Sequence, residues 1–268
     1  MDAFIEALAP RTVSEKINYS IATFGFWIVL FFAAIKLIDI PKMERRAAVA
    51  LKQKFVALVY DVFVLVVPIY NYSKRGIVPK EEEAPEDSLV HLAAGSYYIA
   101  HMIIVVGYKI TNFGQVLHHI LTIAAIFSSN FTGFVQIGTL WLVIYQLSHV
   151  ALHGRAIVKD LGLKYTGLYE LVESIYFAVY LFERIVLGTW VLYQVIFHTN
   201  LSQYVVPLGV GLWVQSLYFC YHMIILAYKK VLKFKERCQK GIHYYWFEEN
   251  PQVQKLSYYR REEKEKVF

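Results

Sequence analysis

The sequence predicts an all-α membrane protein, a polytopic bundle of about seven transmembrane helices. Hydrophobic residues occupy 57% of the 268 positions, aromatic residues 16% and charged residues only 18%, and the mean hydropathy is +0.41. These values are too apolar for a soluble domain of this length. Apolar runs long enough to cross a bilayer recur along the chain, and basic residues gather between alternate runs. We therefore expect a multi-pass membrane protein.

Each predicted span is an apolar run of close to the roughly 20 residues that a helix needs to cross about 30 Å of hydrocarbon. The first two runs are short, and the sixth is long enough to tilt strongly or to leave the membrane. The predicted spans are residues 21–35, 55–70, 88–108, 113–129, 134–152, 168–197 and 204–228. This division predicts an N-terminal segment with the first span, a transmembrane bundle and a polar cytosolic tail. These three parts are residues 1–54, 55–230 and 231–268.

The basic residues predict the orientation of the bundle, because Lys and Arg accumulate near span ends on the cytosolic side. With seven spans, 21 of the 27 Lys and Arg fall on one side of the membrane and five on the other, and Arg184 lies within the sixth span. The N-terminus is thus expected outside or in the lumen, and the tail in the cytosol. This bias and attraction to anionic lipid headgroups explain the net charge of +6, so no nucleic-acid partner is expected.

The last five residues, 264–268 (KEKVF), resemble the KxKxx dilysine signal that returns membrane proteins to the endoplasmic reticulum. A receptor reads this signal in the cytosol, where the charge distribution places the tail. Two lysines at this spacing also arise easily in a basic tail. The endoplasmic reticulum is therefore the favoured membrane. The alternative is another organellar membrane, with the chain as part of a complex.

Polar side chains recur at helical spacing within the later predicted spans, so each of these spans carries a polar stripe. Helices that pointed such stripes at lipid would leave hydroxyls and charges unsatisfied. A bundle that points them inward would enclose a polar chamber, in which His118 would face His149 and Tyr180. The stripes consist of His91, Tyr98 and His101; Gln115, His118 and Thr122; Tyr145, Gln146, His149 and His153; Glu173, Tyr176, Tyr180 and Glu183; and Gln215, Tyr218 and His222.

Four histidines, His118, His119, His149 and His153, are the candidates for chemistry, because imidazoles transfer protons near neutral pH. The stripes also fit plain helix packing, in which each polar contact contributes about 0.6 to 2 kcal/mol. A metal site is a further alternative, because His149 and His153 have the spacing of ligands on one helix face. Membrane di-iron enzymes use several such boxes and this chain has one, so no metal is expected.

The order of three motifs resembles the TLC-domain family, which includes the ceramide synthases. The family's HHxxT motif corresponds to residues 118–122 (HHILT), and a segment like RIGTL follows as residues 136–140 (QIGTL). The HDxSD motif of the next helix corresponds to residues 145–149 (YQLSH) in the same register. The resemblance spans roughly residues 55–230 and implies a helical bundle that handles lipids. Two further similar segments are residues 95–97 and 182–185.

The chain departs from the ceramide synthases at the acidic positions of these motifs. Tyr145 and Gln146 stand where the synthases have HD, and His149 stands where they have the final Asp. His153 and His101 occupy two further positions where the family has an acid. Ceramide synthesis is therefore expected to be absent. The stretch 146–155 is closer to the non-synthase branch of the family, for which roles in membrane lipid composition or lipid transfer are proposed.

If chemistry is retained, the resemblance implies acyl transfer from acyl-CoA, with His118 or His119 as acyl acceptor or general base. Glu173 or Glu183 would then replace the missing acids. The residues expected to bind lipid or to face the polar chamber are Thr122, Tyr145, Gln146, His149, His153, Glu173, Tyr180, Arg184, His101 and His222.

The expected function is the binding or transfer of membrane lipids or the control of membrane lipid composition. No cofactor is expected, apart from acyl-CoA in the catalytic case, and we favour a protein that is not an enzyme. The alternative is a non-catalytic structural subunit of a larger membrane protein complex. The tail supports this alternative, because its aromatic residues, among them Tyr244, Trp246 and Tyr258, offer contacts to protein partners.

Overall fold

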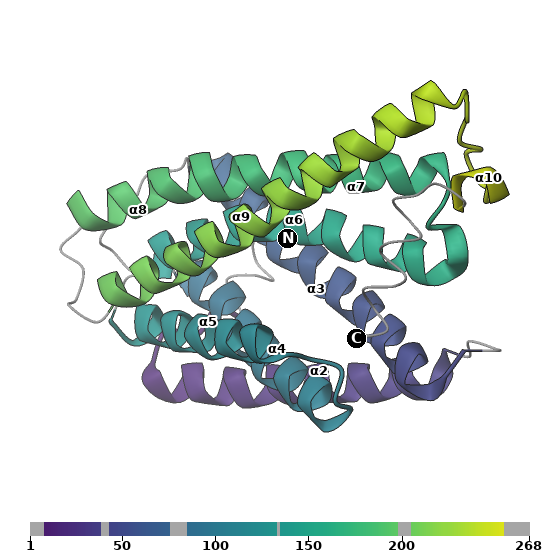
Figure 1. Cartoon of the computed structure of the whole chain (residues 1–268). Helices are drawn as coiled ribbons and strands as arrows, with labels where there is room; N and C mark the ends of the chain where they lie inside the picture. Colours follow the sequence, from purple (N-terminus) through teal and green to yellow (C-terminus); the bar gives the residue numbers. More distant parts are fainter. Residues whose placement is uncertain (1–7, 39–42, 76–84, 133–134, 198–204, 255–268) are drawn as a thin grey trace.

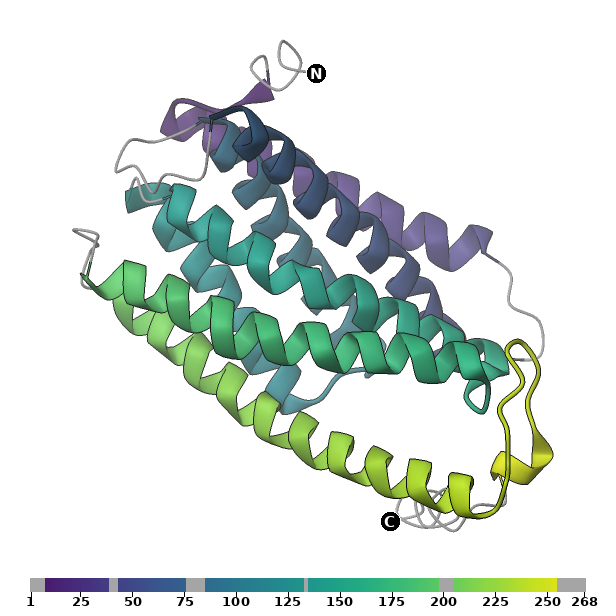
Figure 2. The same ribbon diagram turned by 90° about the horizontal axis from the view of Figure 1, so that it is seen from above.

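The computed structural model describes residues 8–38, 43–75, 85–132, 135–197 and 205–254, and its regular elements are all helices. The long helical segments run back and forth along the bundle, and each long segment is antiparallel to the next (Figures 1 and 2). The expected all-α bundle is thereby confirmed. The helices are α2 (Val13–Leu37), α3 (Arg45–Arg75), α4 (Pro85–Gly107), α5 (Phe113–Thr132), α6 (Val135–Val158), η1 (Lys159–Leu163), α7 (Gly167–Leu181), η2 (Phe182–Leu187), α8 (Gly188–Phe197), α9 (Val205–Gln239) and α10 (Pro251–Gln254).

Among the described residues, six helical segments are long and apolar enough to cross a membrane. The other predicted span is α5, a helix of 20 residues that is less apolar because it carries Gln115, His118 and His119. It packs against α4, α6 and α9, which shield these polar groups from lipid. The six segments are Val13–Leu37, Arg45–Lys74, Pro85–Gly107, Val135–Leu163, Gly167–Phe197 and Val206–Gln239.

The chain reverses direction between α6 and α7 through the π-helix η1. Gly162 has a φ of 85° there, a left-handed conformation that glycine adopts at little cost. Thr166 caps α7, because its Oγ1 atom accepts a hydrogen bond from the Tyr169 N–H at 3.3 Å. α7, the π-helix η2 and α8 then continue as one rod of 31 residues, which matches the long sixth apolar run.

An aromatic core fixes the first helices of the bundle. α2 packs along α4, and α3 packs along α6. The Trp27 indole N–H donates to the Ala93 carbonyl at 3.1 Å, and the rings of Tyr60 and Tyr97 stack with centroids 3.7 Å apart. This packing holds α3 and α4 in the positions from which they contribute polar groups to the interior.

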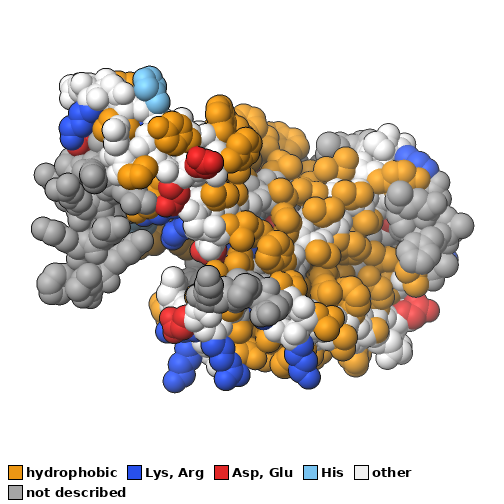
Figure 3. All heavy atoms as spheres, turned by 90° about the vertical axis from the view of Figure 1, so that its right-hand side faces the viewer, with side chains coloured by type: hydrophobic (Ala, Val, Ile, Leu, Met, Phe, Trp, Pro, Cys, Tyr) orange, Lys and Arg blue, Asp and Glu red, His pale blue; other side chains and the backbone are white. Residues whose placement is uncertain are grey.

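The outer faces of the helices carry exposed apolar side chains, such as Ile21, Val29 and Phe182. Hydrophobic side chains cover much of the face drawn in Figure 3, and Lys and Arg lie toward its edges. An extended apolar surface of this kind is unfavourable in water and is what a lipid-facing surface requires.

α9 continues past residue 230 to Gln239, so the expected boundary between bundle and tail lies inside a helix. The chain then turns at Gly241, whose φ is 63°, and returns toward the start of α7. Residues 255–268, which include Tyr258 and the dilysine-like sequence, lie outside the described residues.

Candidate functional site

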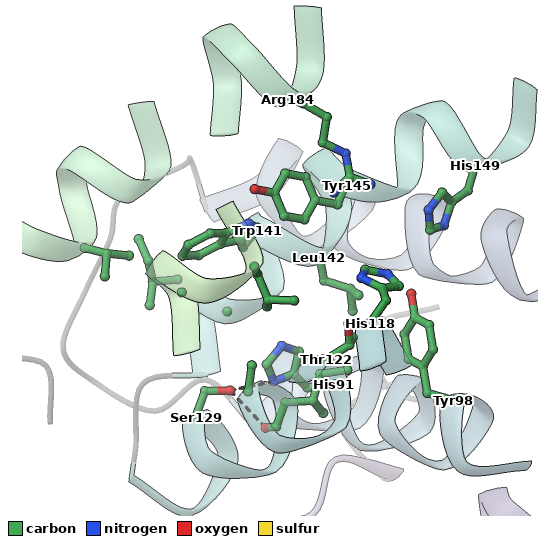
Figure 4. A pocket seen from close by; sticks show the side chains of 17 residues that line it. His91, Tyr98, His118, Thr122, Ser129, Trp141, Leu142, Tyr145, His149 and Arg184 are labelled. Atoms are coloured by element: carbon green, nitrogen blue, oxygen red, sulfur yellow. Dashed lines mark hydrogen bonds between the residues drawn. The ribbon is translucent and has the colours of Figure 1, made fainter. Parts of the chain in front are cut away.

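A cavity lies inside the bundle between α4, α5, α6, η2, α8 and α9. The cavity has a volume of about 70 Å³, several times what one water molecule needs. Most of its wall is apolar and includes Ile126, Leu142 and Leu212. Figure 4 shows labelled side chains from several helices around the common space. The titratable and hydroxyl groups in the wall are those of His91, Tyr98, His118, Thr122, Ser129, Tyr145, His149 and Arg184.

α5 turns one face toward the cavity. The His118 Nδ1 atom lies 3.4 Å from Gln215 Oε1 on α9, and Gln215 Nε2 donates to the Gly114 carbonyl at 3.3 Å. These contacts join the start of α5 to α9 and keep His118 at the wall. Residues three or four positions apart share a helix face, and the cavity residues of α5 with this spacing are His118, Thr122, Ala125 and Ser129.

Arg184 brings a buried positive charge to the cavity wall. Its guanidinium lies 3.8 Å from the ring centroid of Tyr145, and Nη1 donates to Ser216 Oγ at 3.1 Å. The Glu183 carboxylate lies 3.0 Å from Arg184 Nε and accepts hydrogen bonds from Ser148 N and Oγ at 2.7 and 3.0 Å. The hydrogen bonds and the opposite charges offset part of the desolvation of this buried pair.

His91 lies on the opposite side of the cavity from Arg184 (Figure 4). Its Nδ1 atom lies 3.1 Å from Ser129 Oγ and 3.0 Å from Asn130 Nδ2. A Cβ atom added to Gly138 would lie 2.5 Å from the His91 ring. Glycine at position 138 is therefore what permits α6 to approach His91 so closely.

The adjacent histidines of α5 face different surroundings. His118 lines the cavity, whereas His119 packs against His101 on α4. The His101 Nδ1 and His119 Nε2 atoms lie 3.0 Å apart and share a hydrogen bond, and His101 Nε2 donates to Gln53 Oε1 at 2.7 Å when it carries the proton. His101 and His119 thus form a buried pair beside the cavity.

Asp61 on α3 is a buried carboxylate that the sequence interpretation missed. Gln146 Nε2 donates a hydrogen bond to its Oδ1 atom, and His153 Nε2 lies 3.7 Å from its Oδ2 atom. Asp61 therefore joins Gln146 and His153, which lie outside the cavity wall. The signal was available, because an acidic residue in the middle of a predicted span is uncommon and usually has a partner.

The other expected residues are dispersed. Tyr180 is buried, with its ring 5.2 Å from the Arg184 guanidinium, but it does not line the cavity. Glu173 lies 3.3 Å from Lys230, and His222 is exposed on α9. Within the described part of the chain, no group of three or more His, Cys, Asp and Glu is placed to hold a metal ion. That no metal binds stays a prediction.

The helical bundle and its apolar outer surface define a polytopic membrane protein with a small, mostly apolar internal cavity. The family model of the TLC domain matches residues 50–247. Because this match covers most of the chain, the protein belongs to the TLC-domain family, and the family predicted from the sequence is confirmed. A search of curated proteins found no match. Membership of this family indicates a general connection with membrane lipids.

Proposed function

We propose that the protein binds a short aliphatic segment of a membrane lipid in its internal cavity, with the polar part of the lipid at the wall formed by His118, His149 and Arg184. The observation that carries this proposal is a mostly apolar, internal cavity with a few convergent polar side chains (Figure 4). Sites for small apolar ligands have this composition, in which the few polar groups orient the ligand.

The charge at the wall favours a lipid with an uncharged polar group. Arg184 is protonated at any physiological pH, but the carboxylate of Glu183 lies 3.0 Å from its Nε atom and offsets much of its charge. A phosphate at this wall would be desolvated and only weakly compensated. An ester or amide carbonyl, or a hydroxyl, would accept or donate hydrogen bonds there without that penalty.

Acyl transfer is the second candidate function, favoured by the position of His118 in the cavity wall. An imidazole there is placed to act as acyl acceptor or general base toward a lipid in the cavity. His119 is hydrogen-bonded to His101 instead. Of the two adjacent histidines, we therefore propose that His118 contacts the ligand. Ceramide synthesis is proposed to be absent, because Tyr145, Gln146 and His149 replace the synthase motif.

The alternative of a structural subunit drew its support from the tail. In the described part of that tail, the chain itself holds the segment after α9: the Gly167 and Leu168 N–H groups donate to the carbonyls of Tyr245 and Trp246 at 2.8 and 3.2 Å. These contacts within the chain account for the position of the segment 245–246 without a protein partner. The proposed membrane is the endoplasmic reticulum, on the basis of the dilysine-like residues 264–268.

Native mass spectrometry of the full chain, purified in mild detergent, tests the proposal. Ala125 lines the cavity and Ala124 does not, so Ala125→Leu fills the cavity whereas Ala124→Leu is a matched control. We expect a retained lipid on the unaltered protein and on Ala124→Leu, and about tenfold less on Ala125→Leu, because overpacking costs about 1 to 3 kcal/mol.

Two results would contradict lipid binding in the cavity. One is equal lipid retention by both variants, which would place the lipid on the outer surface. The other is an unaltered protein that carries no lipid and is purified with stoichiometric protein partners, which would favour the structural subunit.

A further inference from the structure

A second pocket lies at one end of the bundle, apart from the internal cavity. It encloses about 450 Å³ between the first turns of α7, the last turns of α9 and the segment 242–247. Figures 1 and 2 show these elements together at the end that carries α10. The positive-inside distribution predicts that this end faces the cytosol.

The walls of this pocket are fixed by backbone and side-chain contacts. Gly167 N donates to the Tyr245 carbonyl at 2.8 Å, and the Tyr244 hydroxyl donates to Glu170 Oε1 at 3.0 Å. Asn250 Nδ2 donates to the His243 carbonyl at 2.7 Å. The returning segment is therefore attached to α7 and closes the pocket from one side.

The pocket has an excess of positive charge. Among the described residues, Lys230, Lys233 and Arg237 line it together with a single carboxylate, that of Glu170. Glu170 forms ion pairs with both lysines. Lys230 also lies 3.3 Å from Glu173, which has Arg155 as a further partner at 3.7 Å. These six groups combine four cations with two carboxylates, so the pocket favours an anion.

Arg237 is the cation best placed to bind that anion. Its Nη1 atom donates to the Ile242 carbonyl at 3.1 Å, and its guanidinium lies 4.8 Å from the ring centroid of Tyr244. Among the described residues it has no carboxylate partner, and its buried Nε atom has no hydrogen-bond partner. A planar guanidinium with remaining donors matches the geometry of a phosphate group.

Exposed aromatic side chains surround the pocket. Phe234 is 57% exposed, Trp246 59% and Phe247 70%. Phe234 and Trp246 line the pocket itself. Trp and Tyr concentrate where a membrane meets water, at the level of the lipid headgroups. The pocket thus combines a site for an anion with apolar side chains that suit acyl chains beside it.

We infer that this pocket binds the phosphate group of an anionic phospholipid at the membrane surface. Basic pockets at the cytosolic ends of transmembrane helices recognise such headgroups through charge and hydrogen bonds. The cavity near His118 shares no lining residue with this pocket, so the inference does not depend on the proposed function.

The test compares lipid binding by the full chain in native mass spectrometry, with phosphatidic acid and phosphatidylcholine as probes. Arg237→Gln removes one of the three cations that line the pocket, and Lys235→Gln removes an exposed cation of the same helix that does not line it. We expect phosphatidic acid to bind in preference to phosphatidylcholine. Arg237→Gln should weaken phosphatidic acid binding about tenfold, whereas Lys235→Gln should change it less than about twofold.

Inorganic phosphate, added at the concentration of the lipid, distinguishes the source of the phosphate. The inference requires that it leave the phosphatidic acid adduct unchanged; displacement of the lipid would point to a soluble phosphorylated ligand and overturn it. Equal losses in Arg237→Gln and Lys235→Gln, or no preference for phosphatidic acid, would also overturn it.

Two further variants serve as controls. One replaces Arg237→Gln if that variant misfolds, and the other distinguishes this pocket from the internal cavity. His243 is exposed and lines the pocket, so His243→Glu should repel the phosphate if Arg237→Gln does not fold. Ala125→Leu should leave phosphatidic acid binding unchanged, because Ala125 lies in the other cavity. Loss of binding in Ala125→Leu alone would assign the lipid to that cavity and refute the second site.

Discussion

Replacing Glu183 by Gln should destabilise the bundle strongly, because the variant leaves Arg184 without its buried counter-charge. The Arg184 side chain is only 5% exposed, and its Nε atom lies 3.0 Å from the Glu183 carboxylate. Gln at position 183 keeps the size of the side chain and one oxygen for Ser148, but it carries no charge. Removing one partner of a buried ion pair costs about 3 to 5 kcal/mol.

Removing both charges should cost less than the sum of the single changes. Arg184→Met keeps an apolar stem of similar length and leaves Glu183 as the uncompensated charge, so this single variant should also lose about 3 kcal/mol. The double variant Glu183→Gln with Arg184→Met has no buried charge to compensate. We expect it to recover about 2 kcal/mol or more relative to additivity, the coupling typical of residues in contact.

Thermal unfolding of the four purified proteins in the same detergent measures these differences. For a chain of this size, a loss of about 3 kcal/mol lowers the melting temperature by roughly 6 to 12 °C. The reasoning is refuted if either single variant melts within about 2 °C of the unaltered protein, or if the effects of the two changes simply add.

Two further predictions concern the polar groups beside the cavity. His119→Ala should lower stability by about 1 to 3 kcal/mol, because it leaves the buried Nδ1 atom of His101 without its hydrogen-bond partner. His118→Ala should change the melting temperature less, but it should abolish any acyl transfer and reduce the lipid seen in native mass spectrometry. The reverse pattern would show that His119 is the ligand-binding residue. Asp61→Asn should change stability little, because the amide oxygen of Asn still accepts the hydrogen bond from Gln146. Asp61→Leu should lower the stability measured by thermal unfolding by about 1 to 3 kcal/mol. Equal stability of the two variants would show that the hydrogen bond to Gln146 contributes nothing.

Much of the fold could be predicted from the sequence, because hydrophobic runs and helical periodicity are local properties. The apolar runs predicted the long helices, and the sixth run corresponds to Gly167–Phe197. The same periodicity placed His118 and Thr122 on one face and turned His119 away. The structure has His118 and Thr122 in one cavity wall and His119 against His101.

The set of residues that line the site could not be predicted in full, because a polar stripe identifies a helix face without showing which other helix packs against that face. The stripe of α9 includes both Gln215, which contacts His118, and His222, which is exposed. Asp61 reaches Gln146 only through the packing of α3 along α6. The π-helix η2 also changes the angular spacing near Arg184, which a regular α-helical projection does not include.

The central claim, a lipid inside the bundle, is tested most directly by electron cryomicroscopy of the full chain in lipid nanodiscs. The claim predicts elongated density in the cavity, with its polar end within hydrogen-bond distance of His118, His149 or Arg184. A map in which side chains fill the cavity, or in which His118 points into the surrounding bilayer, would contradict it.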